Sequence, residues 1–202
     1  MAADQFDVSR ETRDRLRIYQ GLLEKWNSKI NLVAPSTLAE SWERHFLDSL
    51  QVFHLQKEEP RHWCDLGSGA GFPGMVAAIA AVGAGWNSSF TLIESDQRKC
   101  TFLRTVSRET GIPVTILAER IEDAPAQRAD VISARALAPL PRLLPWVLRH
   151  VAPNGRAFLP KGRKYQQEIE EVRDNFAFSL EINPSQVDSE SVILKLESIR
   201  DV

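Results

Sequence analysis

The chain has 202 residues, of which 43% are hydrophobic and 26% are charged. These values are typical of a globular protein, and this length allows one domain with a full core. The formal net charge of −2 excludes a general attraction to a polyanion, so binding of nucleic acid would need a local cluster of Lys and Arg. Cys64 and Cys100 fit no spacing of zinc ligands, and we expect buried thiols and no metal site.

We expect neither a secretory leader nor a membrane-spanning segment in this sequence. Residues 1–9 include two aspartates and lack an apolar run. The most apolar stretch, residues 75–86, is shorter than the roughly 20 residues that a membrane helix needs. We therefore expect a cytoplasmic protein that has no membrane partner and acts as a monomer.

Helical patterns occupy the first part of the chain. Ser9 is a plausible helix cap, and apolar residues then recur at spacings of three and four, which predicts an amphipathic helix over residues 10–29. A second helix is predicted over residues 37–55, and the polar residues 57–61 form a linker. Residues 1–58 are thus expected to form an N-terminal helical extension, and residues 59–202 one compact domain.

After residue 61, strands and helices alternate. Strands are predicted over residues 62–66, 90–94, 114–118, 129–133 and 156–160, with helices over residues 73–82, 97–110, 141–151 and 165–175. Parallel strands need connections of this length. Apolar residues alternate again over 176–182 and 192–196 without a helix between them, which predicts an antiparallel hairpin. The fold class is α/β: a Rossmann-like, mostly parallel seven-stranded sheet with a terminal antiparallel hairpin, the architecture associated with class I S-adenosylmethionine-dependent methyltransferases.

A glycine-rich loop follows the first predicted strand, at the edge of the sheet where ligands of such folds bind. It reads Gly67-Ser-Gly69-Ala-Gly71-Phe-Pro-Gly74, so its backbone can approach a ligand closely. Asp65 precedes the loop, and Glu94 ends the second predicted strand. A dinucleotide would place its pyrophosphate here, because residues 69–74 satisfy the pattern GxGxxG. The extra carboxylate favours S-adenosylmethionine, with Asp65 on the ammonium group and Glu94 on the ribose hydroxyls.

The segment after the third strand is expected to border the adenine of the same ligand. Ile121 could pack on the ring, and Glu122 could bind the exocyclic amine. Lys161, Arg163 and Lys164 cluster after the fifth strand, on the side where the substrate should lie, and we expect them to contact RNA.

His45 and Asp48 lie three residues apart on the second predicted helix and can therefore touch. A pairing with Arg44 that docks the extension onto the following domain is the expected role. A metal site is not expected, because no third ligand accompanies them.

Several of these segments, taken together, resemble one family. They are Trp26-Asn-Ser-Lys-Ile-Asn-Leu32, Arg44-His-Phe-Leu-Asp-Ser-Leu50, the loop from Asp65 to Gly74, Leu92-Ile-Glu-Ser95, residues 99–104, Ile132-Ser-Ala-Arg-Ala136 and Pro160-Lys-Gly162. The chain is similar, over roughly residues 24–164, to the ribosomal small-subunit methyltransferase G family, also called glucose-inhibited division protein B.

The resemblance implies a function, a partner and site residues. The family methylates N7 of a guanine in bacterial 16S rRNA, within the small ribosomal subunit or its assembly intermediate, with S-adenosylmethionine as donor. The implied cofactor contacts are Gly67, Phe72, Ile121, Glu122 and Arg135. The family commonly reads Ile-Ser-Arg-Ala where this chain reads Ile132-Ser-Ala-Arg135-Ala, so the arginine is displaced by one residue.

Two other functions remain open on the sequence alone. One is an NAD(P)-dependent oxidoreductase, which would use the glycine loop for a pyrophosphate. The other is a non-catalytic RNA-binding assembly factor on the same scaffold. No catalytic residue is predicted, because guanine N7 carries a free lone pair and its methylation needs no general base.

Overall fold

The computed structural model describes residue 6 and residues 8–202. The prediction that residues 1–9 are not a leader therefore concerns a segment that lies largely outside the described residues. In the described part of the chain, no helix has the length and apolar character needed to cross a membrane.

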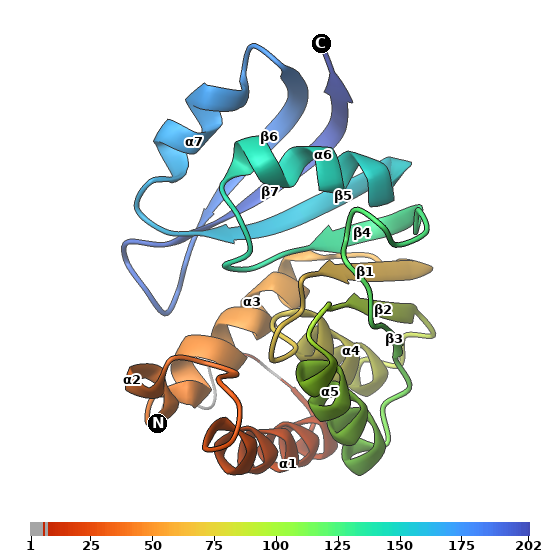
Figure 1. Cartoon of the computed structure of the whole chain (residues 1–202), viewed down its shortest axis with the longest axis vertical. Coiled ribbons are helices and arrows are strands. Elements are labelled where there is room, and N and C mark those ends of the chain that lie inside the picture. Colours follow the sequence, from red (N-terminus) through yellow and green to blue (C-terminus); the bar gives the residue numbers. More distant parts are fainter. Residues whose placement is uncertain (1–5, 7) are drawn as a thin grey trace.

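The centre of the molecule is a seven-stranded sheet with the order β3-β2-β1-β4-β5-β7-β6 (Figure 1). The strands β1 to β5 run parallel, and β7 is antiparallel to both β5 and β6. The predicted mostly parallel sheet with a terminal hairpin is confirmed. The strands are β1 His62–Leu66, β2 Ser89–Ile93, β3 Thr115–Leu117, β4 Ala129–Ser133, β5 Val151–Lys161, β6 Phe176–Pro184 and β7 Val192–Asp201.

Helices cover both faces of the sheet (Figure 1). On one face lie α4 (Gly74–Gly83), α5 (Gln97–Thr110) and the helices of the extension, and on the other lie α6 (Leu140–His150) and α7 (Tyr165–Val172). Each face has its own buried core, and β1 contributes Trp63 to one core and Cys64 to the other. Burial of a parallel strand on both sides explains why β1 has the apolar residues Trp63, Cys64 and Leu66 on both of its faces.

The helical extension differs in one respect from its prediction. Its first helix, α1 (Arg10–Asn27), begins as expected, with the Ser9 side chain accepting a hydrogen bond from the Thr12 amide. The single helix predicted over residues 37–55 is wrong, because the segment divides into α2 (Pro35–Leu38), a π-helical turn over Trp42–Leu47, and α3 (Asp48–Leu55). The wide turn keeps the apolar side chains of this segment buried while His45 and Asp48 face the sheet domain.

The extension shares a core with the glycine loop. The Tyr19 ring stacks on Phe72 with ring centroids 5.4 Å apart and meets the edge of Phe46 at 5.0 Å. The buried Tyr19 hydroxyl donates a hydrogen bond to the carbonyl of Ala70. The boundary expected near residue 58 is therefore crossed by continuous packing, and α1 supports the loop from behind.

Two glycines provide a matched test of this packing. A Cβ at Gly74 would lie 2.5 Å from the Asp65 Cβ and 2.7 Å from a methyl carbon of Leu92, whereas a Cβ at Gly21 in α1 would meet nothing within 4 Å. Gly74→Ala should lower the free energy of unfolding by about 1–3 kcal/mol. Gly21→Ala should raise it by about 0.5–1 kcal/mol, because alanine favours a helix interior. Urea unfolding measures both, and a neutral Gly74→Ala would contradict the tight contact between α4 and β1.

Candidate active site

The glycine loop is held at the ends of β1 and β2 by backbone geometry that favours glycine. Gly67, Gly69 and Gly71 have φ values of 62°, 57° and 96°. The Gly69 amide donates to Glu94 Oε2 at 2.8 Å, which ties the loop to the end of β2. A Cβ at Gly69 would have only the Gly67 carbonyl oxygen nearby, at 3.9 Å, so this part of the loop faces open space.

A cavity of about 440 Å³ lies in front of the loop. It is bounded by the loop, the end of β2, and the segments that follow β3 and β4. Its lining includes every expected cofactor residue except Asp65, namely Gly67, Gly69, Phe72, Glu94, Ile121, Glu122 and Arg135. The volume is within the range of small-molecule sites, so residues distant in sequence form one site of suitable size for a cofactor.

Glu94 is buried and fixed at the floor of this cavity. Its Oε1 accepts a hydrogen bond from the Asp96 amide at 2.8 Å, and its Oε2 accepts the one from Gly69. Each carboxylate oxygen keeps a further lone pair. Glu94 is therefore a rigid acceptor in the cavity lining, and its role toward ribose hydroxyls stays a prediction.

Asp65 occupies a different place from the one expected. It is 1% exposed and lies behind the loop, where its Oδ1 accepts a hydrogen bond from the Ser133 hydroxyl at 2.5 Å. Its Oδ2 is buried without a hydrogen-bond partner among the described residues. Burial raises the pKa of Asp65 to about 6, although the hydrogen bond from Ser133 opposes the rise. Asp65 does not line the cavity, and its side chain instead packs beside Gly74 at the N-terminus of α4. The expected direct contact of Asp65 with a ligand ammonium is therefore corrected.

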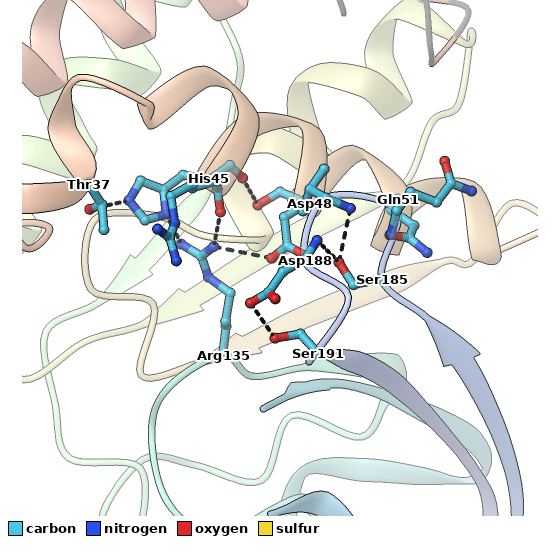
Figure 2. A network of polar contacts seen from close by, with 12 residues as sticks. Thr37, His45, Asp48, Gln51, Arg135, Ser185, Asp188 and Ser191 are labelled. Carbon is cyan, nitrogen blue, oxygen red and sulfur yellow. Dashed lines mark hydrogen bonds and ion pairs between the residues drawn. The ribbon is translucent and has the colours of Figure 1, made fainter. Parts of the chain in front are cut away.

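Arg135, which follows β4, connects the sheet domain to the extension (Figure 2). Its Nη1 donates to the Arg44 carbonyl at 3.1 Å and to Asp48 Oδ2 at 3.2 Å, and its Nη2 donates to His45 Nδ1 at 3.2 Å. The Arg135 and Asp48 side chains are only 16% and 13% exposed. The expected docking contact exists, but Arg135 supplies its cation. The Arg44 guanidinium instead lies 3.7 Å from Glu40.

The hydrogen bonds fix the protonation state of His45. Because Nδ1 accepts from Arg135, the proton of the neutral ring is on Nε2, which donates to Thr37 Oγ1 at 2.9 Å. Burial and the positive charge of Arg135 lower the pKa of His45 to about 4. The Phe72 ring, which lines the first cavity, packs beside this cluster, with its centroid 5.2 Å from that of the His45 ring and 4.9 Å from the Arg135 guanidinium carbon. His45 is therefore a structural group rather than a base.

A second cavity, of about 900 Å³, adjoins the first. Its walls are the extension, the end of β5 and the connection between β6 and β7, residues 185–191. Gln51 in α3 holds this connection in place, because its side chain donates to the Pro184 carbonyl at 2.7 Å and accepts from the Gln186 amide at 2.9 Å. The two cavities share four residues, Leu32, Val33, Arg135 and Ala136.

The expected RNA-contacting residues differ in their accessibility. Lys161 is only 8% exposed, and its Nζ donates to the Ala138 carbonyl and to Glu168 Oε2, both at 2.8 Å. Its side chain is therefore committed to these two contacts, although the residue lines the second cavity, and its expected contact with RNA stays a prediction. Arg163 lies at the surface in an exposed ion pair with Glu190, and Lys164 is exposed.

Sequence reasoning missed several residues that line the cavities. Leu32 and Val33 reach both cavities because the Asn27 side chain accepts hydrogen bonds from their amides, at 3.0 and 2.9 Å. Arg142 and Trp146 line the first cavity, with the guanidinium 5.1 Å from the indole ring. Their spacing of four residues on a predicted helix was a usable signal for that contact. Residues 185–191 carried no signal beyond a polar turn.

Comparison with known proteins agrees with this geometry. Residues 12–192 match the family described as rRNA small subunit methyltransferase G. The chain is 49% identical over 198 residues to the ribosomal RNA small subunit methyltransferase G of Cereibacter sphaeroides, covering 98% of this chain and 96% of that protein. It is 51% identical over 194 residues to the protein of the same name from Rhodospirillum centenum, covering 96% and 88%.

Solved structures of low sequence identity share the fold. A methyltransferase from Geobacter sulfurreducens has a TM-score of 0.61 at 17% identity, covering 91% of this chain and 90% of that one. TYW2 of M. jannaschii, in complex with AdoMet, also has a TM-score of 0.61, at 12% identity, covering 87% and 80%. These two structures support the class I methyltransferase fold.

The raised pKa of Asp65 leads to a prediction about stability. Between its ordinary pKa of 3.8 and about 6, the folded protein binds a proton that the unfolded chain does not. Asp65 should therefore make the wild type less stable as the pH rises from 4 to 7, by up to about 3 kcal/mol. Asp65→Asn lacks this contribution. Urea unfolding of both proteins across this pH range measures the difference, and parallel pH profiles would show that Asp65 has an ordinary pKa.

Proposed function

The chain belongs to the rRNA small subunit methyltransferase G family, and we infer that this S-adenosylmethionine-dependent enzyme methylates N7 of a guanine in 16S rRNA. The observation that carries the proposal is the cavity formed by the glycine loop, Glu94 and residues 119–122, together with the larger cavity that adjoins it. One cavity suits a donor, the other leaves room for a nucleotide, and both are lined by residues of a single chain. These observations support our proposal of an active monomer, and a ribosomal substrate supports action in the cytoplasm.

The lining of the first cavity fits S-adenosylmethionine. Glu94 offers its free lone pairs to the ribose hydroxyls. Ile121 is suited to pack on the adenine ring, and Glu122 to accept a hydrogen bond from its exocyclic amine. Gly69 leaves space for close approach of the ligand. When bound, S-adenosylmethionine supplies an electrophilic methyl group on a positively charged sulfur. The carboxylate of Glu94 favours such a cation electrostatically.

The reaction requires alignment of guanine N7 with the methyl group rather than proton transfer. Guanine N7 forms the new bond with its own lone pair, and no proton leaves the ring. The chain therefore has to hold N7 in line with the methyl group and exclude competing orientations. His45 is consistent with this chemistry, because both of its nitrogens are already hydrogen-bonded.

The structure gives a physical reason against a dinucleotide in the same loop. A pyrophosphate would use the free amides at the N-terminus of α4. The buried Asp65 carboxylate already lies behind that position, beside Gly74. A second negative charge there would be repelled, so the loop is suited to a donor without phosphate groups.

The primary test of this function is methyl transfer to a ribosomal subunit. With methyl-labelled S-adenosylmethionine, the wild type should label 30S subunits that lack the modification, and mass spectrometry of nuclease fragments should locate one methyl group on a guanine. Gly69→Asp should abolish donor binding, measured by isothermal titration, because its side chain enters the cavity beside Glu94.

Gly85→Asp is the matched control for that variant. Gly85 also has a positive φ, 78°, and open space around its Cβ, but it lies outside the cavity lining. It should bind the donor normally. Binding of NADH instead of S-adenosylmethionine by the wild type, or absence of label in the subunits, would refute the methyltransferase function.

We also propose that Arg163 and Lys164 contact the RNA backbone at the carboxyl end of β5. Lys164→Glu should weaken binding of 16S rRNA fragments and lower the slope of log affinity against log salt by about one. Arg200→Glu is the control, because Arg200 is also exposed but lies near the opposite end of β7. Filter binding at several salt concentrations measures both variants. Equal affinities for Lys164→Glu and Arg200→Glu would exclude a specific role for Lys164.

A further inference from the structure

We propose that the second cavity receives the target guanine and that Asp188 recognises it, by accepting hydrogen bonds from its N1–H and 2-amino groups. This inference rests on the proposed function, because it takes the reacting atom to be guanine N7. It assigns the substrate end of the site to the second cavity, which adjoins the first.

The location follows from the wall that the two cavities share. A methyl group held in the first cavity must be reached by N7 across Leu32, Val33, Arg135 and Ala136, the residues that line both cavities. The volume of about 900 Å³ exceeds the need of one base and is within the range of ligand sites. Leu32 and Val33 also present an apolar surface on which a purine can pack.

Guanine must be distinguished from adenine by groups other than N7, because both purines carry that nitrogen. The 2-amino group of guanine lies across the ring from N7, with N1–H beside it. A carboxylate accepts both protons, whereas the N1 lone pair of adenine would be repelled by it. When N7 faces the shared wall, the discriminating acceptor must therefore come from a residue of the second cavity that does not line the first.

Four carboxylates line the second cavity, those of Glu40, Glu43, Asp48 and Asp188. Asp48 is committed to Arg135, and Glu40 lies beside Arg44. Glu43 is exposed on the surface of the π-helical turn. None of these three combines a fixed position with free acceptor capacity. Asp188 does.

The carboxylate of Asp188 is held rigidly by its own loop. Its Oδ1 accepts from the Glu190 amide at 3.0 Å, and its Oδ2 accepts from the Ser191 hydroxyl at 2.8 Å, which leaves a lone pair on each oxygen. These hydrogen bonds keep the pKa of Asp188 below its ordinary value, so the group is ionised at neutral pH. In Figure 2 the carboxylate is directed toward the side of the cavity where Arg135 lies.

The position of this loop is itself fixed by the helical extension. The clamp formed by Gln51 on Pro184 and Gln186 joins α3 to the start of residues 185–191. A preorganised acceptor loses little entropy when it binds, and this strengthens discrimination between bases. The polar connection between β6 and β7 thereby acquires a function that its sequence does not suggest.

Asp188→Asn tests the inference with minimal change in shape. The amide keeps one oxygen for the Glu190 amide and can donate to the Ser191 hydroxyl, so the loop can retain its conformation. Glu190→Gln is the matched control, because it removes a charge from the same loop at a residue outside the cavity lining. Binding of GMP, IMP and AMP is measured by NMR titration with S-adenosylhomocysteine present, and methyl transfer to 30S subunits is measured in parallel.

The wild type and Glu190→Gln should bind GMP more tightly than IMP, which lacks the 2-amino group, and much more tightly than AMP. Asp188→Asn should bind GMP about ten-fold more weakly and lose the preference over IMP, since a hydrogen bond to a charged group contributes about 1.5–3 kcal/mol. Its kcat/KM for 30S subunits should fall by a similar factor, with unchanged affinity for S-adenosylmethionine. Measurable binding of GMP and IMP with equal affinity shows that the cavity of the variant still accepts a purine.

Two results would overturn the inference while leaving the methyltransferase function standing. One is the same GMP preference in Asp188→Asn as in Glu190→Gln. The other is a wild type that methylates 30S subunits but has no preference for GMP. Failure of the wild type to transfer a methyl group would instead refute the proposed function, and nucleotide binding would still decide the role of Asp188.

Discussion

The pairing of Arg135 with the helical extension is the contact on which the geometry of the site depends. A nearly buried guanidinium is costly unless its donors are satisfied, and here three acceptors from Arg44, His45 and Asp48 satisfy it. All three lie in or directly after the π-helical turn, so this irregular segment is shaped to receive Arg135. Loss of the cation would leave Asp48 buried without its partner. Because Arg135 also lines both cavities, the contact that docks the extension sets the wall between them.

The glycine loop meets two constraints at once, from the ligand side and from the core. Gly69 faces open space, so its small size serves the ligand, whereas a Cβ at Gly71 would lie 2.5 Å from the Tyr19 hydroxyl oxygen. Gly71 is therefore required by the packing of α1 beneath the loop. Phe72 serves both sides, because its ring packs on Tyr19 and also lines the first cavity. This loop therefore differs from a general phosphate-binding loop, because packing against α1 of the extension requires some of its residues.

Local rules were sufficient to predict the strands, the helices between them, the terminal hairpin and the position of Glu94, since each follows from periodicity or from the end of a strand. They were not sufficient for residues 37–55, where a π-helical turn divides the expected helix. Contacts between distant segments could not be predicted in this way. Arg135 and Asp48 are 87 residues apart, and Gln51 and Pro184 are 133 apart. The Lys161 side chain is buried in a salt bridge with Glu168 near the end of β5. No pattern in the sequence distinguishes Lys161 from the exposed Lys164. Asp65 was placed correctly on β1, but its side chain points behind the loop.

The distribution of charge in the site explains how a chain with a net charge of −2 can act on RNA. Carboxylates and cations both line the cavities. Glu94 and Arg142 line the first, Asp188 and Lys161 line the second, and Arg135 lines both, whereas Arg163 and Lys164 lie on the surface beyond the end of β5. A sulfonium donor is a cation, and methylation of N7 transfers that positive charge to the guanine. Glu94 in the first cavity and Asp188 in the second are thus favourable before and after transfer, because each lines the cavity that holds the positive charge at that stage. The cations that meet phosphates are a local pair at the surface, so the overall balance of charge need not be positive.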